Sequence, residues 1–464
     1  MGNKWKRVTV ADVCISIVDC VNKTAPVVEY PTNYKMIRTP NIRSGKVTLD
    51  GCRYVEKKVY ETWTRRSKPQ KEDVLLTREA PLGEVGIITT DENIFLGQRI
   101  MQYRADKNKI DPYFLLYSFL SPDLQQQFSM HEGSGSVVSH IRVGDCSKFE
   151  INIPPLEIQR SIVEILKSLD DHIDVNIKIN QTLEQMSQTL FKSWFVNFDP
   201  VIDNALDAGN PIPEALQSRA ELRQKVRNSA DLKPLPADIR ALFPAEFEET
   251  ELGWVPKGWQ PKSMHDLVES VSITFPLGKT DKVIFLNTGD IEKGSFLHQN
   301  YSKTEGLPGQ AKKSIKKGDI LFSEIRPENK RYAFVHFESD DYVVSTKLMV
   351  LRAKNEINPL LPYFIITLED NTKKLQRVAE LRSGTFPQIT FKELEFISFI
   401  MPNNDKIMEL FINSYLTPAY NKIIATKKAN MNLINLRDTL LPKLISGELS
   451  LEDLPNLVDQ TEPA

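Results

Sequence analysis

Hydrophobic residues alternate with polar ones over two long parts of the chain, and a different period follows each part. Before Pro154, and again before Pro402, short apolar stretches of period 2 are separated by Gly, Asn and Asp, which predicts strands joined by turns. After each proline the apolar spacing changes to alternating fours and threes, which predicts a long amphipathic helix. The pattern therefore predicts two similar halves, each a sheet-rich unit followed by a helix.

The first predicted helix begins at Leu156 and carries a heptad seam of about five heptads, over a length of about 57 Å. Its apolar members are Ile158, Ile162, Ile165, Leu169, Ile179, Leu183, Met186 and Leu190. Two polar residues, His172 and Asn176, fall on the same seam. They either fix the register of a helix pair or form a solvated break in the stripe, and both interpretations stay open.

The second predicted helix, from Asp405 to about Leu444, has a looser stripe formed by Ile423, Ile424, Met431, Ile434 and Leu440. Pro418 is expected to kink or interrupt its first half, because proline removes a backbone donor. A lone heptad helix cannot bury its seam. We therefore expect the two helices to pair with each other, antiparallel and side by side.

The two halves also match residue by residue, at an offset of about 248 residues. "KEDVLLTREAPLGEVGI" from Lys71 aligns with "KKGDILFSEIRPENKRYAF" from Lys316, each with a turn acid, Asp73 or Asp319, before an apolar strand. "EGSGSVVSHIRVGDCSKFEINIP" and "LRSGTFPQITFKELEFISFIMP" bring the turn glycines Gly135 and Gly384 into correspondence. The chain is a tandem duplication.

Between the halves lies a segment rich in proline and charge, which predicts a linker with one short helix around residues 215–226. The expected division is a first domain at 1–155, a helix at 156–199, the linker at 200–255, a second domain at 256–402, a second helix at 403–450 and a flexible tail at 451–464.

Composition narrows the class of protein. Apolar residues make up 41% and charged residues 26% of the 464, as in ordinary globular proteins. No apolar run is long enough to span a bilayer, and the first residues lack the apolar region of a secretory signal. Cys14, Cys20, Cys52 and Cys146 have no metal-binding spacing and are expected to be reduced thiols. We expect a cytoplasmic protein with no membrane partner.

Charge becomes informative only along the chain, because the net charge is -2. Residues 53–78 and 303–331 each contain eight basic and four acidic residues, and they occupy matching places in the two halves. A single basic run is usually a solvated surface. Its recurrence in both repeats favours a polyanion, and therefore nucleic acid, as the partner.

Catalytic and metal motifs are not found. The sequence has no Walker-type loop and no H-E-x-x-H, and the six histidines lack ligand spacing. "DPYF" at Asp111 is similar to the Asp-Pro-Pro-Tyr signature of amino-methyltransferases but lacks one proline, and "NIPPLE" at Asn152 lacks the aromatic residue. We therefore expect a non-catalytic chain. Two alternatives stay open: a stand-alone DNA methyltransferase and a coiled-coil scaffold that does not bind DNA.

Four motifs carry a resemblance to a known family over about residues 3 to 450. They are "INIPPLEIQRSIVEIL" from Ile151, "QTLFKSWFVNFDP" from Gln188, "ELGWVPKGW" from Glu251 and "LRDTLLPKLISGEL" from Leu436. With these motifs the chain resembles the DNA-specificity subunit of type I restriction-modification systems. It departs from the family at "PNNDKIMELFINSYLTPAYN", where the usual proline-proline and glutamine pattern is missing.

The resemblance implies an α+β fold with two tandem mixed α/β target-recognition domains, each reading half of a split duplex sequence. The two helices would form an antiparallel coiled-coil spacer that docks two modification subunits and up to two restriction subunits. S-adenosylmethionine would belong to the modification subunit, ATP and Mg to the restriction subunit, and no cofactor or metal to this chain.

Within the two halves we expect DNA contacts from the basic residues of the loops and from the Ser-Gly turns, where backbone can approach a partner closely. The expected contacts are Arg65, Arg66, Arg78, Arg99, Ser134, Gly135, Arg142, Lys312, Lys313, Arg326, Lys330, Lys347, Ser383 and Gly384. Arg65, Arg66, Lys312 and Lys313 are expected to bind phosphates. Among the other basic residues, arginines can bind guanine edges in a bidentate manner, whereas phosphate-bound lysines mainly add salt-dependent affinity. For the Ser-Gly turns, a simple hairpin role is an equal alternative.

Overall fold

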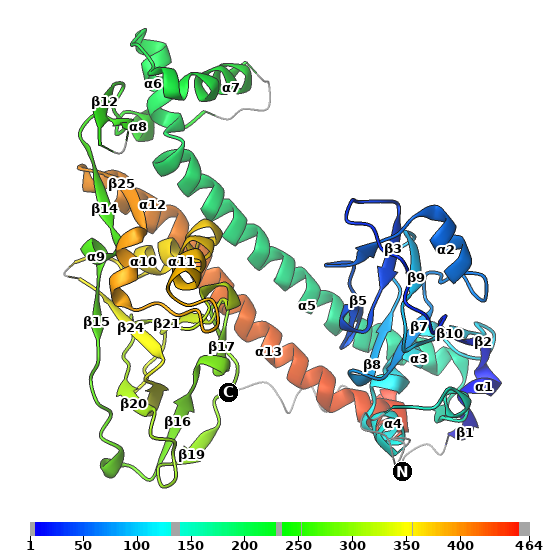
Figure 1. Ribbon diagram of the computed structural model, residues 1–464. Coiled ribbons are helices and arrows are strands. Elements are labelled where there is room, and N and C mark those ends of the chain that lie inside the picture. The colour runs from blue at the N-terminus through cyan, green and yellow to red at the C-terminus, as the bar shows by residue number, and fades with distance from the viewer. Residues whose placement is uncertain (1–4, 131–139, 229–233, 252, 355, 454–464) are drawn as a thin grey trace. The chain divides into compact units, whose positions relative to one another are not determined.

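The computed structural model describes residues 5–130, 140–228, 234–251, 253–354 and 356–453, and it divides into two compact units. Unit 1 comprises Met1–Lys178 and Thr426–Ala464, and unit 2 comprises Ile179–Ala425. The boundary crosses the two long helices α5 (Leu156–Phe191) and α13 (Thr417–Ser446), so each unit contains part of both (Figure 1). Within the described residues, no helix is long and apolar enough to cross a membrane.

Unit 1 is built on a six-stranded sheet of order β2-β10-β7-β8-β5-β4, beside a three-stranded sheet β6-β3-β9 and the pair β1-β11. The strands are β1 (Lys6–Thr9), β2 (Cys14–Asp19), β3 (Tyr34–Ile37), β4 (Ile42–Arg43), β5 (Gly45–Val47), β6 (Arg53–Tyr54), β7 (Val74–Arg78), β8 (Leu82–Ile87), β9 (Asn93–Leu96), β10 (Ile100–Ala105) and β11 (Glu150–Ile153). Helices α1 (Val10–Val13), α2 (Lys57–Trp63), α3 (Pro112–Leu120) and α4 (Pro122–Met130) complete it. Aromatic side chains of α3 and α4 pack in the core, with Phe119 and Phe128 in edge-to-face contact.

Unit 2 repeats this plan with the sheets β15-β24-β21-β22 and β19-β16-β23-β20, the pair β14-β25 and the hairpins β12-β13 and β17-β18. The strands are β12 (Phe247–Thr250), β13 (Gly253–Pro256), β14 (Trp259–Ser263), β15 (Val268–Val271), β16 (Lys282–Leu286), β17 (Ile291–Glu292), β18 (Ser295–Phe296), β19 (Tyr301–Lys303), β20 (Ala311–Ser314), β21 (Ile320–Ser323), β22 (Tyr332–Phe334), β23 (Tyr342–Ser345), β24 (Leu348–Ala353) and β25 (Ser398–Pro402). Its helices are α6 (Asp199–Ala208), α7 (Gln217–Arg227), α8 (Ala237–Arg240), α9 (Met264–Leu267), α10 (Leu360–Thr367), α11 (Glu369–Arg382) and α12 (Asp405–Phe411).

The expected duplication is confirmed by the order of strands. The order β2-β10-β7-β8 in unit 1 corresponds to β15-β24-β21-β22 in unit 2, and β1-β11 corresponds to β14-β25. Each unit also has a parallel pair at the matching place, β3 with β9 and β16 with β23, and unit 1 has a second parallel pair, β5 with β8. The α+β fold with two similar halves is therefore present.

The two long helices pack side by side and antiparallel, as expected (Figure 1). Within unit 1, Asn176 Nδ2 donates to Asn430 Oδ1 at 2.8 Å, and Arg437 Nη1 donates to Asp170 Oδ1 at 2.9 Å. The partner number falls as the residue number on α5 rises, which sets the antiparallel direction. Of the two interpretations of Asn176, the structure supports the one in which it pairs with the second helix.

The buried seam of α5 differs from the expected one at every second position. Its buried positions include Leu166, Ile173, Asn180 and Ser187, one heptad apart. His172 is exposed, which supports for this residue the interpretation as a solvated break in the stripe. Met186 is 62% exposed and was placed wrongly on the seam. The expectation failed because Asn180 and Ser187 are polar, which made their apolar neighbours look like the core positions.

The second helix shows the same shift and the expected interruption. Ile423 and Leu440 are buried, whereas Met431 is 56% exposed and Ile434 is exposed too, because Thr426 and Asn430 occupy the seam. The chain runs from α12 through a π-helical turn (η9, Ile412–Leu416) into α13, whose second residue is Pro418. The π-helical turn lies just before Pro418. Because proline has no backbone N–H, it cannot make the hydrogen bond that a regular helix would need at this position.

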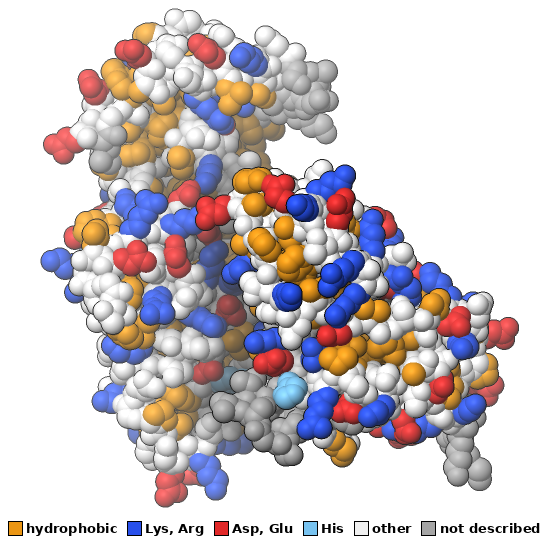
Figure 2. Space-filling view, turned by 45° about the vertical axis from the view of Figure 1, so that its right-hand side comes forward, with side chains coloured by type: hydrophobic (Ala, Val, Ile, Leu, Met, Phe, Trp, Pro, Cys, Tyr) orange, Lys and Arg blue, Asp and Glu red, His pale blue; other side chains and the backbone are white. Residues whose placement is uncertain are grey.

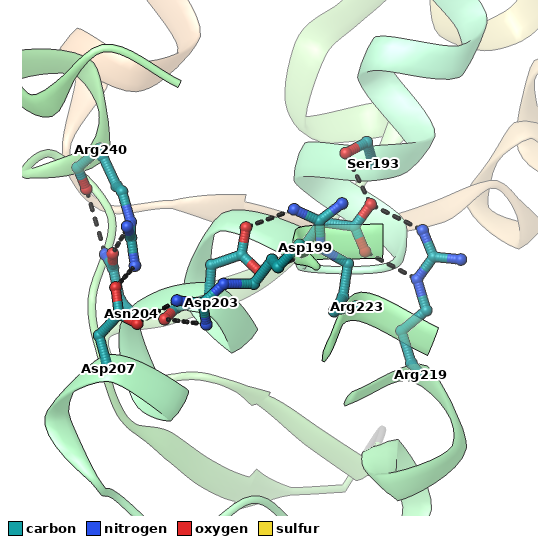
Figure 3. Close-up of polar contacts among 9 residues, drawn as sticks. Ser193, Asp199, Asp203, Asn204, Asp207, Arg219, Arg223 and Arg240 are labelled. Carbon is teal, nitrogen blue, oxygen red and sulfur yellow. Dashed lines mark hydrogen bonds and ion pairs between the residues drawn. The ribbon is translucent and has the colours of Figure 1, made fainter. Parts of the chain in front are cut away.

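Helices α6, α7 and α8 lie in the described part of the segment expected to be a linker, and α7 lies close to the expected short helix. Three arginines of α7 reach three aspartates of α6, and in every pair the residues are 20 apart, so the two helices run parallel (Figure 3). The pairs are Arg219 with Asp199, Arg223 with Asp203, and Arg227 with Asp207. We call these three ion pairs the α6–α7 ladder.

Candidate nucleic-acid interface

A buried carboxylate marks the start of the central strand in each unit. Asp73, before β7, accepts hydrogen bonds from Arg104 Nε at 2.8 Å and Arg104 Nη2 at 2.8 Å. Asp319, before β21, accepts from Arg352 Nε at 2.8 Å and Nη2 at 2.9 Å. In both units the hydrogen bond to the aspartate raises the pKa of the arginine. These bidentate pairs fix one end of the strand whose other end leads into the candidate loops.

In unit 1, three segments meet beyond the end of β7. The Arg78 N–H donates to the carbonyl of Arg99 at 2.8 Å, and the Ile141 N–H donates to the carbonyl of Arg78 at 3.0 Å. We call the segments around these residues loop cluster 1. It therefore brings Arg78, Arg99 and Arg142 together from distant parts of the sequence.

Unit 2 has the same arrangement, which we call loop cluster 2. The Glu324 N–H donates to the carbonyl of Lys347 at 3.1 Å, and the Ile389 N–H donates to the carbonyl of Glu324 at 2.8 Å. The Arg326 N–H also donates to the carbonyl of Pro387 at 3.1 Å, which ties the Ser383–Gly384 turn to the same cluster. The two clusters use equivalent backbone bonds.

Backbone strain concentrates in both clusters. Eight non-glycine residues have positive φ in the part of the chain that the structure describes, and four of them are Ala80, Arg99, Arg326 and Lys330. Such residues cost about 1–3 kcal/mol each and are typical of functional loops. Three of these four are cations that the sequence had already selected as contacts.

Three cations of the clusters lie beside carboxylates. Arg99 Nε is 3.2 Å from Glu79, and Lys347 Nζ is 3.8 Å from Glu324, at side-chain exposures of 46% and 45%. Lys330 pairs with Glu369. Exposed pairs of this kind contribute about 0–1 kcal/mol, so a phosphate can replace the carboxylate at little cost.

Two expected contacts are engaged inside the protein instead. The side chain of Arg78 is 11% exposed, pairs with Asp19 at 3.1 Å and donates to the carbonyl of Ile141 at 3.0 Å. Lys313 Nζ donates to the carbonyls of Thr346 at 3.1 Å and Leu348 at 2.8 Å, and burial lowers its pKa. Both side chains hold loops in place in this structure.

The other expected contacts lie at the surface or outside the described residues. Arg65 and Arg66 follow α2 and are exposed, as are Arg142, Lys312, Arg326 and Gly384. Ser383 is half-buried, and its hydroxyl accepts from the Phe386 N–H at 3.2 Å. Ser134 and Gly135 lie outside the described residues, so the expected match of Gly135 with Gly384 is not described.

Sequence reasoning missed three exposed features of unit 2. Leu381 and Phe386 flank the Gly384 turn and are 88% and 50% exposed. Lys282 and Lys303 are directly opposite each other on β16 and β19, a like-charge pair that favours a bound anion. The Lys282 ammonium also lies 4.8 Å from the ring centroid of Tyr301. Only the cross-strand register, which the sequence does not show, brings these side chains together.

The surface carries both signs of charge (Figure 2). On the face that Figure 2 shows, lysine and arginine side chains are interspersed with acidic ones. Among the described residues, no group of three His, Cys, Asp or Glu side chains is arranged to hold a metal ion. The four cysteines are free thiols, as expected, and burial raises the pKa of Cys146 to about 11.

Comparison with known proteins matches most of the chain to one family, in two separate segments. A family model of the type I restriction modification DNA specificity domain matches residues 2–185 and again residues 256–435. The HindI specificity subunit of Haemophilus influenzae is 42% identical over 185 residues, which are 39% of this chain and 39% of that protein. The chain therefore matches about two fifths of that relative's length. The MjaIX specificity subunit of Methanocaldococcus jannaschii is 26% identical over 415 residues, 87% of this chain and 83% of that protein.

Among solved structures, the S subunit of a type I restriction-modification system from M. genitalium matches with a TM-score of 0.52 and 14% identity. The match covers 96% of each chain and shows a shared fold. The family model covers most of the chain in two copies, and these copies coincide with the two similar halves of the fold. This chain belongs to the family of type I restriction modification DNA specificity domains.

Proposed function

We propose that this chain is the DNA-specificity subunit of a type I restriction-modification complex, and that each unit reads one half of a split duplex target. The observation that carries the proposal is the repetition of one loop cluster in both units. Arg99 and Lys347 occupy equivalent places in it, each exposed and each beside a glutamate. Two related readers suit a target made of two separate halves.

We assign the residues of the clusters to bases, to phosphates or to the positioning of the loops, according to the type and exposure of their side chains. Arg99, Arg142 and Arg326 are exposed and can bind guanine edges in a bidentate manner. Lys312, Lys330 and Lys347, with Arg65 and Arg66, are suited to phosphates. Arg78 and Lys313 position the loops, and Leu381 and Phe386 supply apolar contact to bases. We propose Ser134 and Gly135 as the counterparts of Ser383 and Gly384.

We further propose that the helix pair is a spacer that docks two modification subunits. Within unit 1, Val175 and Ile177 of α5 and Met431 of α13 are 52%, 41% and 56% exposed, which leaves apolar surface for further helices. Up to two restriction subunits would join the complex. S-adenosylmethionine would be bound by the modification subunit, and ATP and Mg by the restriction subunit. We propose that the functional parts are a first reading domain at residues 1–155, a spacer helix at 156–199, a linker at 200–255, a second reading domain at 256–402 and a second spacer helix at 403–450.

Exchange of one unit's reading domain tests the proposal. Residues 256–402 are replaced by the matching segment of a relative, and the methylated sites are mapped in DNA from cells that carry the complete system. We expect one half of the methylated motif to change and the other half to stay. Exchange of residues 1–155 is the matched control and should change only the opposite half. If either exchange alters both halves, or neither does, the units are not separate readers.

A further inference from the structure

A groove of about 1040 Å³ opens in unit 2 between the segment that leads into α10 and the helix that follows β25. Its floor is apolar and belongs to the main core of the unit. Leu267, Leu361, Met408 and Ile412 line it, and each is 2–6% exposed. Partly buried Met401 continues the apolar surface on the strand side.

The rim of the groove is strongly acidic. Asp266, Glu356, Asp405 and Glu409 line it and are exposed, against a single cation, Lys262. Asp266 is occupied as a helix cap, since its carboxylate accepts from the Ser263 N–H at 2.7 Å. Within the described residues the other three carboxylates form no ion pair. An acidic rim around an apolar floor repels nucleic acid and attracts a cationic protein segment.

The groove coincides with the place where the two halves of the chain differ. In unit 1, the Gln159 side chain joins α5 to the segment before α3, because it accepts from the Asp111 N–H at 2.9 Å and donates to the Lys109 carbonyl at 3.1 Å. The equivalent residue in unit 2 is Ile407, which has no polar group for such a bridge.

The lining residues differ as well. Met408 and Ile412 of the groove correspond to Arg160 and Glu164 in unit 1, where an apolar floor cannot form. The π-helical turn η9 begins at Ile412, so the irregular start of the second helix also shapes the groove. The departure from the family's helix pattern, at the start of the second helix, therefore coincides with the groove in unit 2.

We propose that this groove docks a basic amphipathic helix of a protein partner. The apolar stripe of such a helix would cover the floor, where two methionines can adapt to its side chains, and its lysines and arginines would pair with the rim. The chain's own last residues, "LPNLVDQTEPA", carry acidic and no basic groups, so their charge does not suit this rim. This inference goes beyond the proposed function and does not depend on which DNA is read.

Binding of a defined peptide to the full chain tests the groove. The probe is a fluorescent helical peptide of about 18 residues, about 27 Å long, with leucines on one face and lysines on the other. A peptide of the same composition in scrambled order controls for charge alone. The test variant combines Glu356→Lys, Asp405→Lys and Glu409→Lys. The matched variant combines Glu269→Lys, Glu305→Lys and Glu395→Lys, which reverses three exposed carboxylates elsewhere in unit 2.

We expect the groove variant to bind the peptide at least about tenfold more weakly and with less salt dependence, and the matched variant to bind like the original chain. Equal loss in both variants, or equal binding of the scrambled peptide, would overturn the proposal. A groove variant that changes the oligomeric state would assign the groove to a second copy of the chain instead. Titration with duplex DNA separates this result from the proposed function, because the groove variant should retain its duplex binding.

Discussion

At the scale of single residues, the clearest functional sign is a cation that has only a weak partner. Arg99 and Lys347 are about half exposed and lie 3.2 and 3.8 Å from glutamates of the same loop cluster. An exposed pair of this kind holds the side chain near its place without competing strongly with a phosphate or a base. The equivalent position in both units carries this arrangement, whereas neighbouring cations differ between the units.

Replacement of these two cations should separate their roles. We expect Lys347→Ala to weaken binding to all duplexes about equally and to reduce the slope of affinity against salt by about one. Arg99→Ala should instead relax the preference at one base pair, by about 1–3 kcal/mol. Fluorescence titrations of duplex DNA at several salt concentrations measure both effects. Lys428→Ala, on an exposed position of α13, is the control. An unchanged salt slope in Lys347→Ala would place the phosphate contacts elsewhere.

The buried aspartates beneath the loops should matter for stability. Asp319 is fully buried and accepts from Nε and Nη2 of Arg352, so Asp319→Ala leaves a partly buried guanidinium without its partner. We expect a loss of about 3 kcal/mol in the free energy of unfolding, measured by urea denaturation. The double variant Asp319→Ala with Arg352→Met should regain part of this loss. If the double variant is less stable than the single one, the pair does not act as described.

Some residue roles could be predicted from the sequence, and others could not. The sequence predicted both Arg78 and Arg99 to be loop arginines that contact DNA. Only the fold shows that Arg78 faces inward onto Asp19 while Arg99 faces solvent. Leu381 and Phe386 looked like ordinary apolar residues of a strand and turn, although they are exposed beside the candidate contacts. Side-chain direction depends on neighbours that are distant in the sequence.

At the scale of elements, the helix pair was predictable in length and direction but not in register. The apolar pattern placed the start of α5 at Leu156, where the structure has it. It failed at Asn180 and Ser187, because a buried polar residue leaves no hydrophobic signal. The seam instead depends on polar contacts across the pair, such as that of Asn176 with Asn430.

This asparagine pair should fix the register of the helices. Asn430→Ala removes the partner of Asn176 and should lower stability by about 1–2 kcal/mol. Asn176→Leu with Asn430→Leu should restore or increase stability and lose the specification of a single register. Thermal unfolding measures the first effect, and disulfide trapping between cysteines placed on α5 and α13 measures the second. One trapped register in the double variant would show that other contacts set the alignment.

The α6–α7 ladder should make α7 sensitive to acid. Hydrogen bonds from Arg227 and then Arg240 lower the pKa of Asp207. A depressed carboxyl pKa stabilises the fold above the ordinary value of about 3.8, and this contribution is lost as the pH falls through the lower folded value. Hydrogen exchange should therefore show α7 opening below about pH 4 before the core of unit 2 does. Arg223→Gln should open α7 already at neutral pH, and Lys225→Gln, on an exposed position of the same helix, should not. Simultaneous opening of α7 and the core would contradict a separately held helix.

At the scale of the whole molecule, duplication explains the architecture and divergence explains its asymmetry. The strand orders, the buried aspartate pairs and the loop clusters recur in both units, which agrees with the predicted tandem duplication. The acidic groove does not follow the repeat, since Met408 and Ile412 of its floor correspond to the charged Arg160 and Glu164 in unit 1. The sequence showed where the second helix departs from the first, but the groove also needs the segment before α10, which is distant in the chain.

The shared helices lead to a prediction about the target itself. Both α5 and α13 cross the boundary between the units, so their length should set the gap between the two half-sites. One heptad inserted after Lys178 and one after Ala425, at the unit boundary, keep the seam in phase and lengthen the pair by about 10 Å.

At about 3.4 Å per base pair along one strand, this heptad insertion corresponds to about three base pairs. Bending absorbs part of it, so we expect the non-specific gap of the methylated motif to grow by about one to three base pairs. Both half-sites should stay the same, because no loop moves relative to its own sheet. Insertion of the heptad in α5 alone is the control and should disturb the helix pair and weaken methylation. A methylated motif with an unchanged gap would show that contacts outside this chain set the spacing.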